Sequence, residues 1–226
     1  MKKLILLAII ALGLIYSKSA KAQNIQLLYD TGRNCVTSTV EMFRPDKGGS
    51  TYFFVDLDYE PNITQGYWEI AREFNFWQDT KMGWLSAHIE YNGGLSSKYG
   101  SYANSFLGGA TYSGHSKDFS KTWSLSALYK IIPGLGGANM HTFQITGVWG
   151  IDFAKGWCSF SGFFDFWQEV GTPIFISEPQ FWVNLNKIKG WEKVNLSFGG
   201  EVELGYNFAG ANGFKVYPAV GAKYTF

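Results

Sequence analysis

The chain has 226 residues, of which 19 are basic and 18 are acidic, so its formal net charge is +1. This balance provides no basic surface for a nucleic-acid partner. Aromatic residues make up 18% of the chain and charged residues only 16%, with 27 glycines, a composition that suits a β-barrel with aromatic girdles and tight turns.

The first residues are typical of an export signal. Two lysines follow the initial Met, an apolar run covers 4–15, and an A-x-A cleavage site ends at Ala22. This pattern predicts a signal peptide over 1–22, with a retained membrane helix as the alternative, and one outer-membrane β-barrel over 23–226. The leader holds four of the basic residues and no acidic ones, which leaves a mildly acidic chain of net charge −3. No later segment approaches 18 continuous apolar residues, so no helical membrane domain is expected.

Apolar and polar residues alternate along much of the remaining chain, which is the period of a β-strand with one apolar and one wet face. The clearest predicted strands are 51–59, 122–131, 157–167 and 194–208. Weaker ones are predicted near 24–31, 36–44, 66–76, 83–92, 103–113, 141–151 and 174–187. In the 66–76 segment Arg72 falls on the apolar face, which predicts either a bulge or a position near a rim.

The last predicted strand, 214–226, is long and ends on Phe226. Its even positions are apolar or aromatic, and its odd positions are smaller or polar. It resembles the C-terminal signature of bacterial outer-membrane barrels, and it implies recognition by the barrel assembly machinery. The alternative is the edge strand of a soluble sheet, which would be long, flat and prone to aggregation.

These segments add up to about twelve strands joined by glycine-rich turns, each long enough to cross a bilayer at a tilt. We therefore predict an all-β fold: a single transmembrane antiparallel β-barrel of about twelve strands in the bacterial outer membrane, in contact with its lipid. The even count puts both termini on the periplasmic side. Cys35 and Cys158 then lie near opposite rims, too far apart for a disulfide. No C-x-x-C or other metal-binding spacing occurs, so neither a metal nor a cofactor is predicted.

The inward face combines many carboxylates with aromatic rings. The inward acids are Asp30, Glu41, Asp56, Asp58, Glu69, Glu73, Glu90, Asp165, Glu178, Glu201 and Glu203. The inward aromatics are Tyr52, Phe54, Trp84, Trp157, Phe163, Trp167 and Trp182. Such an interior predicts a lumen that passes small solutes, although a lumen filled by paired side chains is the alternative. Aromatic planes beside carboxylates suit a neutral ring with hydroxyl groups, a nucleoside or a sugar, and the negative potential disfavours anions.

The chain also resembles the Tsx-like family of nucleoside-specific outer-membrane channels. The resemblance runs through TSTVEMF at 37–43, STYFFVDLDYE at 50–60, YWEIAREFNF at 67–76 and the close GAKYTF at 221–226. The resemblance implies a twelve-stranded barrel with a narrow lumen that passes nucleosides. This chain departs from the family in its shorter connections and in the absence of an obvious inward arginine. The acids that match these strands are Glu41, Asp56, Asp58, Glu69 and Glu73. With Tyr52, Phe54, Trp84 and Trp167 they form the predicted substrate-binding set.

Two other classes of function are compatible with a twelve-stranded barrel. One twelve-stranded family is a phospholipase with a lipid-facing Ser–His pair, and His141 is predicted to face outward. No outward serine is evident beside it, so an enzyme is not expected. A structural or partner-docking barrel with a filled lumen is the third possibility.

Overall fold

The computed structural model describes residues 23–60, 64–98, 100–134 and 137–226, and it is almost entirely β-sheet. The strands are β1 (Gln23–Asp30), β2 (Cys35–Asp46), β3 (Gly49–Tyr59), β4 (Thr64–Phe74), β5 (Leu85–Ser96), β6 (Gly100–His115), β7 (Lys121–Ile132), β8 (Met140–Phe153), β9 (Cys158–Glu169), β10 (Thr172–Ser177), β11 (Gln180–Asn184), β12 (Leu196–Tyr206) and β13 (Phe214–Thr225). Single turns of 3-10 helix lie between strands at Ala154–Gly156, Leu185–Lys187 and Phe208–Gly210. The predicted signal peptide over 1–22 lies outside the described residues, within which no helix is long and apolar enough to cross a membrane.

All strand pairs are antiparallel, and the sheet closes on itself because β1 pairs with both β2 and β13. The segments β10 and β11 both lie between β9 and β12, so they occupy one position in the sheet. The protein is therefore a closed twelve-stranded antiparallel barrel, as the alternation predicted.

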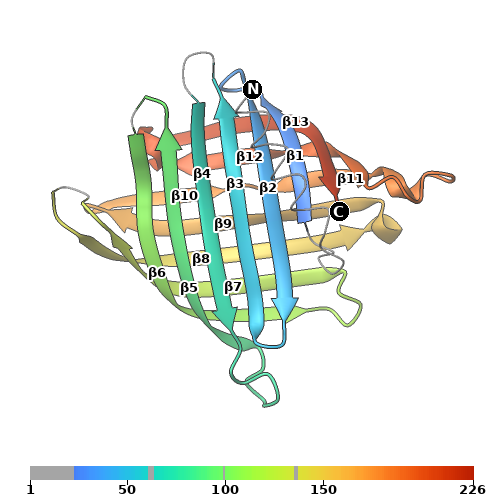
Figure 1. Ribbon diagram of the computed structural model, residues 1–226, viewed down its shortest axis with the longest axis horizontal. Helices are drawn as coiled ribbons and strands as arrows, with labels where there is room; N and C mark the ends of the chain where they lie inside the picture. Colours follow the sequence, from blue (N-terminus) through green and yellow to red (C-terminus); the bar gives the residue numbers. More distant parts are fainter. Residues whose placement is uncertain (1–22, 61–63, 99, 135–136) are drawn as a thin grey trace, which may run out of the picture.

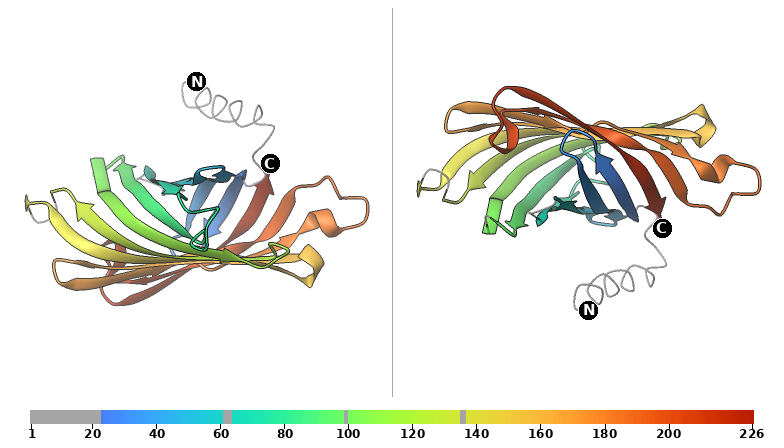
Figure 2. Two further views of the ribbon diagram at one scale, coloured as in Figure 1. Left: turned by 90° about the horizontal axis from the view of Figure 1, so that it is seen from below. Right: turned by 90° about the horizontal axis from the view of Figure 1, so that it is seen from above.

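The barrel is flattened rather than round. Strands β1 to β5 lie side by side across one face, whereas β7 to β12 cross behind them at a steep angle (Figure 1). The views from below and from above show these two curved layers facing each other (Figure 2). The long strands β6 and β13 pass from one layer to the other, so the corners of the barrel lie at β6–β7 and at β13–β1.

Burial alternates along the strands as the sequence predicted. On β1, Leu27 is 57% exposed whereas its neighbours Gln26 and Leu28 are each 1% exposed. The same alternation on the other strands leaves large apolar side chains on the outer surface, among them Ile70, Ile89, Phe106, Leu125, Phe143, Phe166, Phe198 and Val220. A continuous outward apolar surface is what a lipid-facing barrel requires.

Most observed strands differ from the predicted ones by a few residues at one or both ends; 103–113, for example, runs from Gly100 to His115. The 66–76 strand runs instead from Thr64 to Phe74. The 174–187 strand is broken at Glu178–Pro179, because a proline has no N–H for the ladder, and it ends at Asn184. The 194–208 strand ends at Tyr206, so Phe208 does not point outward with its alternation but packs edge-on against Trp167, with ring centroids 6.2 Å apart.

Arg72 lies near a rim, which is one of the two outcomes predicted for it. The β4 register has no shift, and the guanidinium donates to Asp46 at the tip of the β2–β3 hairpin, with Nη2 2.9 Å from Oδ1. The Arg72 guanidinium, with the Gly48 N–H, holds the pKa of Asp46 at about 2. Near an interface a charged side chain costs little, so this arginine is compatible with a lipid-facing strand.

Both described chain ends lie at the same end of the barrel, where the Phe226 N–H donates to the Gln23 carbonyl. We call it the termini end, and the other the opposite end. Cys35 begins β2 at the opposite end and Cys158 begins β9 at the termini end. Both thiols are free, so the prediction that they do not pair is confirmed.

Glycines allow neighbouring strands to approach closely at the two corners. A Cβ built on Gly109 of β6 would lie 2.1 Å from the Ala127 carbonyl oxygen of β7, and one on Gly221 of β13 would lie 2.0 Å from that of Leu27 on β1. No side chain fits at such distances, so glycine is required at both positions.

We expect Gly109→Ala to destabilise the barrel by about 1–3 kcal/mol, because the added methyl group overpacks the β6–β7 corner. The adjacent Gly108 is the matched control, since a Cβ there would come no closer than 3.8 Å to the His88 carbonyl oxygen. Urea unfolding of the refolded protein measures both variants. Equal midpoints for the two would contradict the role given to this corner.

Candidate functional site

A cavity of about 1050 Å³ occupies part of the barrel interior. Its rim includes Asp46, Gly49, Asn75 and Gln78, which lie in or beside connections at the termini end. Its deepest lining residues lie near the middle of the strands. No described residue from the turns of the opposite end lines it, so the cavity opens toward the termini end.

Seven of the nine residues predicted to bind substrate line this cavity: Glu41, Tyr52, Phe54, Asp56, Glu69, Glu73 and Trp84. Trp84 lies at the rim just before β5, is 46% exposed and packs edge-on against Tyr112. The other two predicted residues, Asp58 and Trp167, face inward but lie toward the opposite end and do not line the cavity. The structure therefore brings most of the predicted set together and separates those two from it.

One wall of the cavity, formed by β2, β3 and β4, alternates carboxylates with rings. The Asp56 carboxylate accepts a hydrogen bond from the Thr39 hydroxyl at 2.6 Å, and Glu69 accepts one from the Tyr67 hydroxyl at 2.6 Å. The Phe54 ring lies between those of Tyr52 and Tyr67, with centroids 6.0 and 5.8 Å apart. The wall presents aromatic surface and hydrogen-bond acceptors side by side.

Strand β5, next to this wall, and strands β8 and β9 of the other layer carry lining residues that were not in the predicted set. His88 on β5 lies between two acids, with Nε2 3.1 Å from the Glu90 carboxylate and Nδ1 3.9 Å from that of Glu73. On β8 and β9, Gln144 donates to Thr146 at 3.0 Å, and Thr146 donates to Asp165. The inward alternation had already placed Glu90 and Asp165 on this face. Gln144 and Thr146 could have been found in the same way on the weaker 141–151 strand.

Two further lining acids come from β12 and from the break between β10 and β11. Glu201 accepts a hydrogen bond from the Gln180 amide at 3.0 Å. Glu178 lies at the break, where its backbone N–H still donates to the Phe163 carbonyl at 3.1 Å. In the part of the chain that the structure describes, no donor reaches the Glu178 carboxylate.

Side chains fill the rest of the lumen in two clusters. Trp167, Ile174 and Ile176 pack together with Phe163 and Phe208. In the second cluster Leu28, Trp182 and Ala219 pack together. A lysine lies beside each cluster. Lys130 Nζ is 4.0 Å from the Trp167 ring centroid, and Lys223 Nζ is 4.5 Å from the Trp182 ring centroid. The lumen is thus part cavity and part packed interior.

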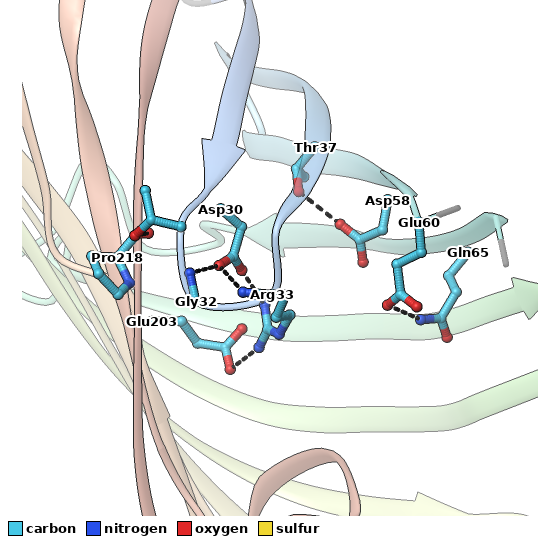
Figure 3. A network of polar contacts seen from close by, with 10 residues as sticks. Asp30, Gly32, Arg33, Thr37, Asp58, Glu60, Gln65, Glu203 and Pro218 are labelled. Carbon is cyan, nitrogen blue, oxygen red and sulfur yellow. Dashed lines mark hydrogen bonds and ion pairs between the residues drawn. The ribbon is translucent and has the colours of Figure 1, made fainter. Parts of the chain in front are cut away.

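The opposite end is tied together by a polar network (Figure 3). Arg33, in the turn after β1, bridges two inward acids: its guanidinium lies 3.0 Å from the Asp30 carboxylate and 2.5 Å from that of Glu203 on β12. It also stacks on the Tyr217 ring at 4.0 Å. Burial lowers the pKa of Arg33, but the hydrogen bond and charge of Glu203 raise it by more, so the guanidinium stays charged. We call Arg33, Asp30, Glu203 and Tyr217 the arginine latch.

On the outer surface, His141 does not pair with a serine. Its Nδ1 lies 2.8 Å from the Tyr129 hydroxyl, and the two rings are 5.8 Å apart. A tyrosine–histidine pair on an exposed barrel surface is typical of an interfacial aromatic girdle.

Comparison with known proteins identifies the family of this chain and solved structures of similar fold. A family model described as "Domain of unknown function (DUF5020)" matches residues 22–226. No curated protein matches the chain. The solved structure titled "KdgM porin" has a TM-score of 0.51 and 10% identity, covering 90% of this chain and 98% of that one. The "NanC porin" structure has a TM-score of 0.58 and 8% identity, covering 91% of this chain and 100% of that one. At these identities the likeness is one of fold, and the resemblance to the nucleoside-channel family stays a prediction.

Proposed function

The chain belongs to the family described as a domain of unknown function, DUF5020, and we propose that it is an outer-membrane channel for small solutes. The observation that carries this proposal is the cavity of about 1050 Å³, lined by carboxylates and aromatic rings and open at one end, inside a barrel whose outer surface is apolar. Two solved structures of similar fold are titled porins, which supports the same class of function.

Nucleosides are the solutes we propose, with sugars second. A base can stack on Tyr52 and Phe54, while ribose hydroxyls donate to Asp56 and Glu69 on the same wall. Each hydrogen bond to a carboxylate in a partly dehydrated site is worth about 1.5–3 kcal/mol, so a few of them give weak, reversible binding. Weak binding at several positions is what passage requires.

With both chain ends on the periplasmic side, the cavity mouth faces the periplasm in this proposal. Passage to the outside then requires the packed clusters or the arginine latch to move. A second candidate function, a structural or partner-docking barrel that never conducts, is favoured by this filled opposite end.

Planar-bilayer recording of the refolded chain tests the proposal. We expect a conducting barrel whose current is blocked by nucleosides. Asp56→Asn together with Glu73→Gln should weaken the block by about tenfold or more, because it removes two carboxyl groups that accept hydrogen bonds from the solute. Asp58→Asn is the matched control, because Asp58 faces inward two residues from Asp56 but lies off the cavity.

The outcomes separate the candidates. Absence of conductance would favour the docking barrel. Conductance without block by any solute would indicate a general pore. If the Asp58→Asn control weakens block as much as the double variant, the solute does not bind in this cavity.

A further inference from the structure

We propose that the cavity selects positively charged, ring-bearing solutes, so that organic amines with an aromatic ring bind better than neutral compounds of the same shape. This inference rests on the proposed function for how a solute reaches the cavity. It adds a charge preference that the resemblance to nucleoside channels does not imply.

The first observation is the charge of the lining. Eight carboxylic side chains line the cavity below its rim: Glu41, Asp56, Glu69, Glu73, Glu90, Asp165, Glu178 and Glu201. No described lysine or arginine lines it, and His88 is the one lining side chain below the rim that can become a cation. Carboxylates that share a low-dielectric cavity repel each other, and a cation placed among them relieves that repulsion.

The second observation is that the lysines of the lumen lie outside the cavity and already have partners. Lys130 is 6% exposed, donates to Gln144 at 2.7 Å and lies over the Trp167 ring. Lys223 lies over the Trp182 ring. Neither lines the cavity, so the Glu178 carboxylate, which no described donor reaches, is available to a ligand.

The third observation is the position of the rings. The Lys130 and Lys223 ammonium groups and the Arg33 guanidinium each lie within 4.5 Å of a ring centroid, so this interior holds a cation against an aromatic face at three places. The cavity offers the same pairing without its cation, because Tyr52 and Phe54 lie on the wall that carries Asp56 and Glu69. A ring-bearing ammonium ion can stack on one and pair with the other.

Three probes of matched shape test the charge preference: 2-phenylethylamine, a cation at neutral pH; 2-phenylethanol, which is neutral; and phenylacetate, an anion. Binding to the refolded full chain is measured by calorimetry in neutral detergent. We expect the amine to bind about tenfold or more tighter than the alcohol, as a cation–π contact plus a charge pair gives, and phenylacetate to bind weakest. Glu178→Gln should weaken binding of the amine and leave that of the alcohol unchanged. Asp58→Asn should change neither.

Equal affinities for amine and alcohol, or tightest binding of phenylacetate, would overturn the proposal. So would an unchanged amine affinity in Glu178→Gln. Bilayer recording tests the channel function separately from the charge preference. A barrel that conducts but does not prefer the amine refutes only the charge preference. A barrel that binds the amine and never conducts refutes only the channel.

Discussion

Replacing Trp182 by alanine is expected to lower the free energy of unfolding by about 3–5 kcal/mol, the range for removing a large buried aromatic side chain. Trp182 is fully buried in the lumen against Leu28 and Ala219. Its indole N–H donates to Gln180 at 2.9 Å, and its ring covers the Lys223 ammonium group. The truncation therefore leaves a cavity, an acceptor without its donor and a half-buried ammonium group without its ring.

Trp191 provides the matched control, because it is 46% exposed in the connection between β11 and β12. Trp191→Ala should change stability by no more than about 0.5 kcal/mol. Urea unfolding followed by tryptophan fluorescence in detergent compares the two variants. Similar losses would mean that the lumen around Trp182 is not packed as described.

Replacing Arg33 by alanine is expected to lower stability by about 1–3 kcal/mol, because it leaves Asp30 and Glu203 without their common partner. Their side chains are 5% and 14% exposed, so water compensates little. The same change frees the turn after β1 from β12, and in a conducting barrel it should raise the fraction of time spent open. Bilayer recording measures that fraction, and urea unfolding measures the stability.

A double-mutant cycle isolates the pair within the arginine latch. Glu203→Gln alone should cost less than Arg33→Ala, since it leaves no unpaired charge on Glu203, and the two changes together should cost less than their sum. Arg33→Lys should lie between wild type and alanine, because lysine keeps the charge but loses the two-sided contact and part of the stacking. An additive cycle would show that Arg33 and Glu203 are not coupled.

The strand order could be predicted from the sequence because lipid outside and polar groups inside impose a strict period of two. Every predicted strand exists, and even the exception at Arg72 is explained by a rim position. The break at Glu178–Pro179 could also have been predicted, since Pro179 lies inside a predicted strand. The flattening of the barrel could not be predicted, because the alternation along a strand does not give the angle between the two layers.

The candidate site shows the limit of the same reasoning. The period of two assigns a side chain to a face of the sheet, but it does not give its depth along the lumen. Asp56 and Asp58 have the same parity and the same chemistry, yet only Asp56 reaches the cavity. Depth is decided by the tilt and stagger of the strands and by which side chains pack across the interior, here Trp167 and Trp182.

Because β1 pairs with β13, the strands of the barrel form a closed ring. The backbone hydrogen bonds continue around this ring across the point where the chain begins and ends. Seven residue pairs join these strands, from Asn24 with Thr225 to Asp30 with Ala219. A chain rewired from Phe226 to Gln23 through a short linker, and opened in the 185–195 connection, would keep every strand pair and end on β11. The strand pairing is the same whichever strand comes last in the chain. The recognition signal expected at Phe226, in contrast, requires that β13 be the last strand. The closure of the sheet and the choice of the last strand are therefore separable in this protein.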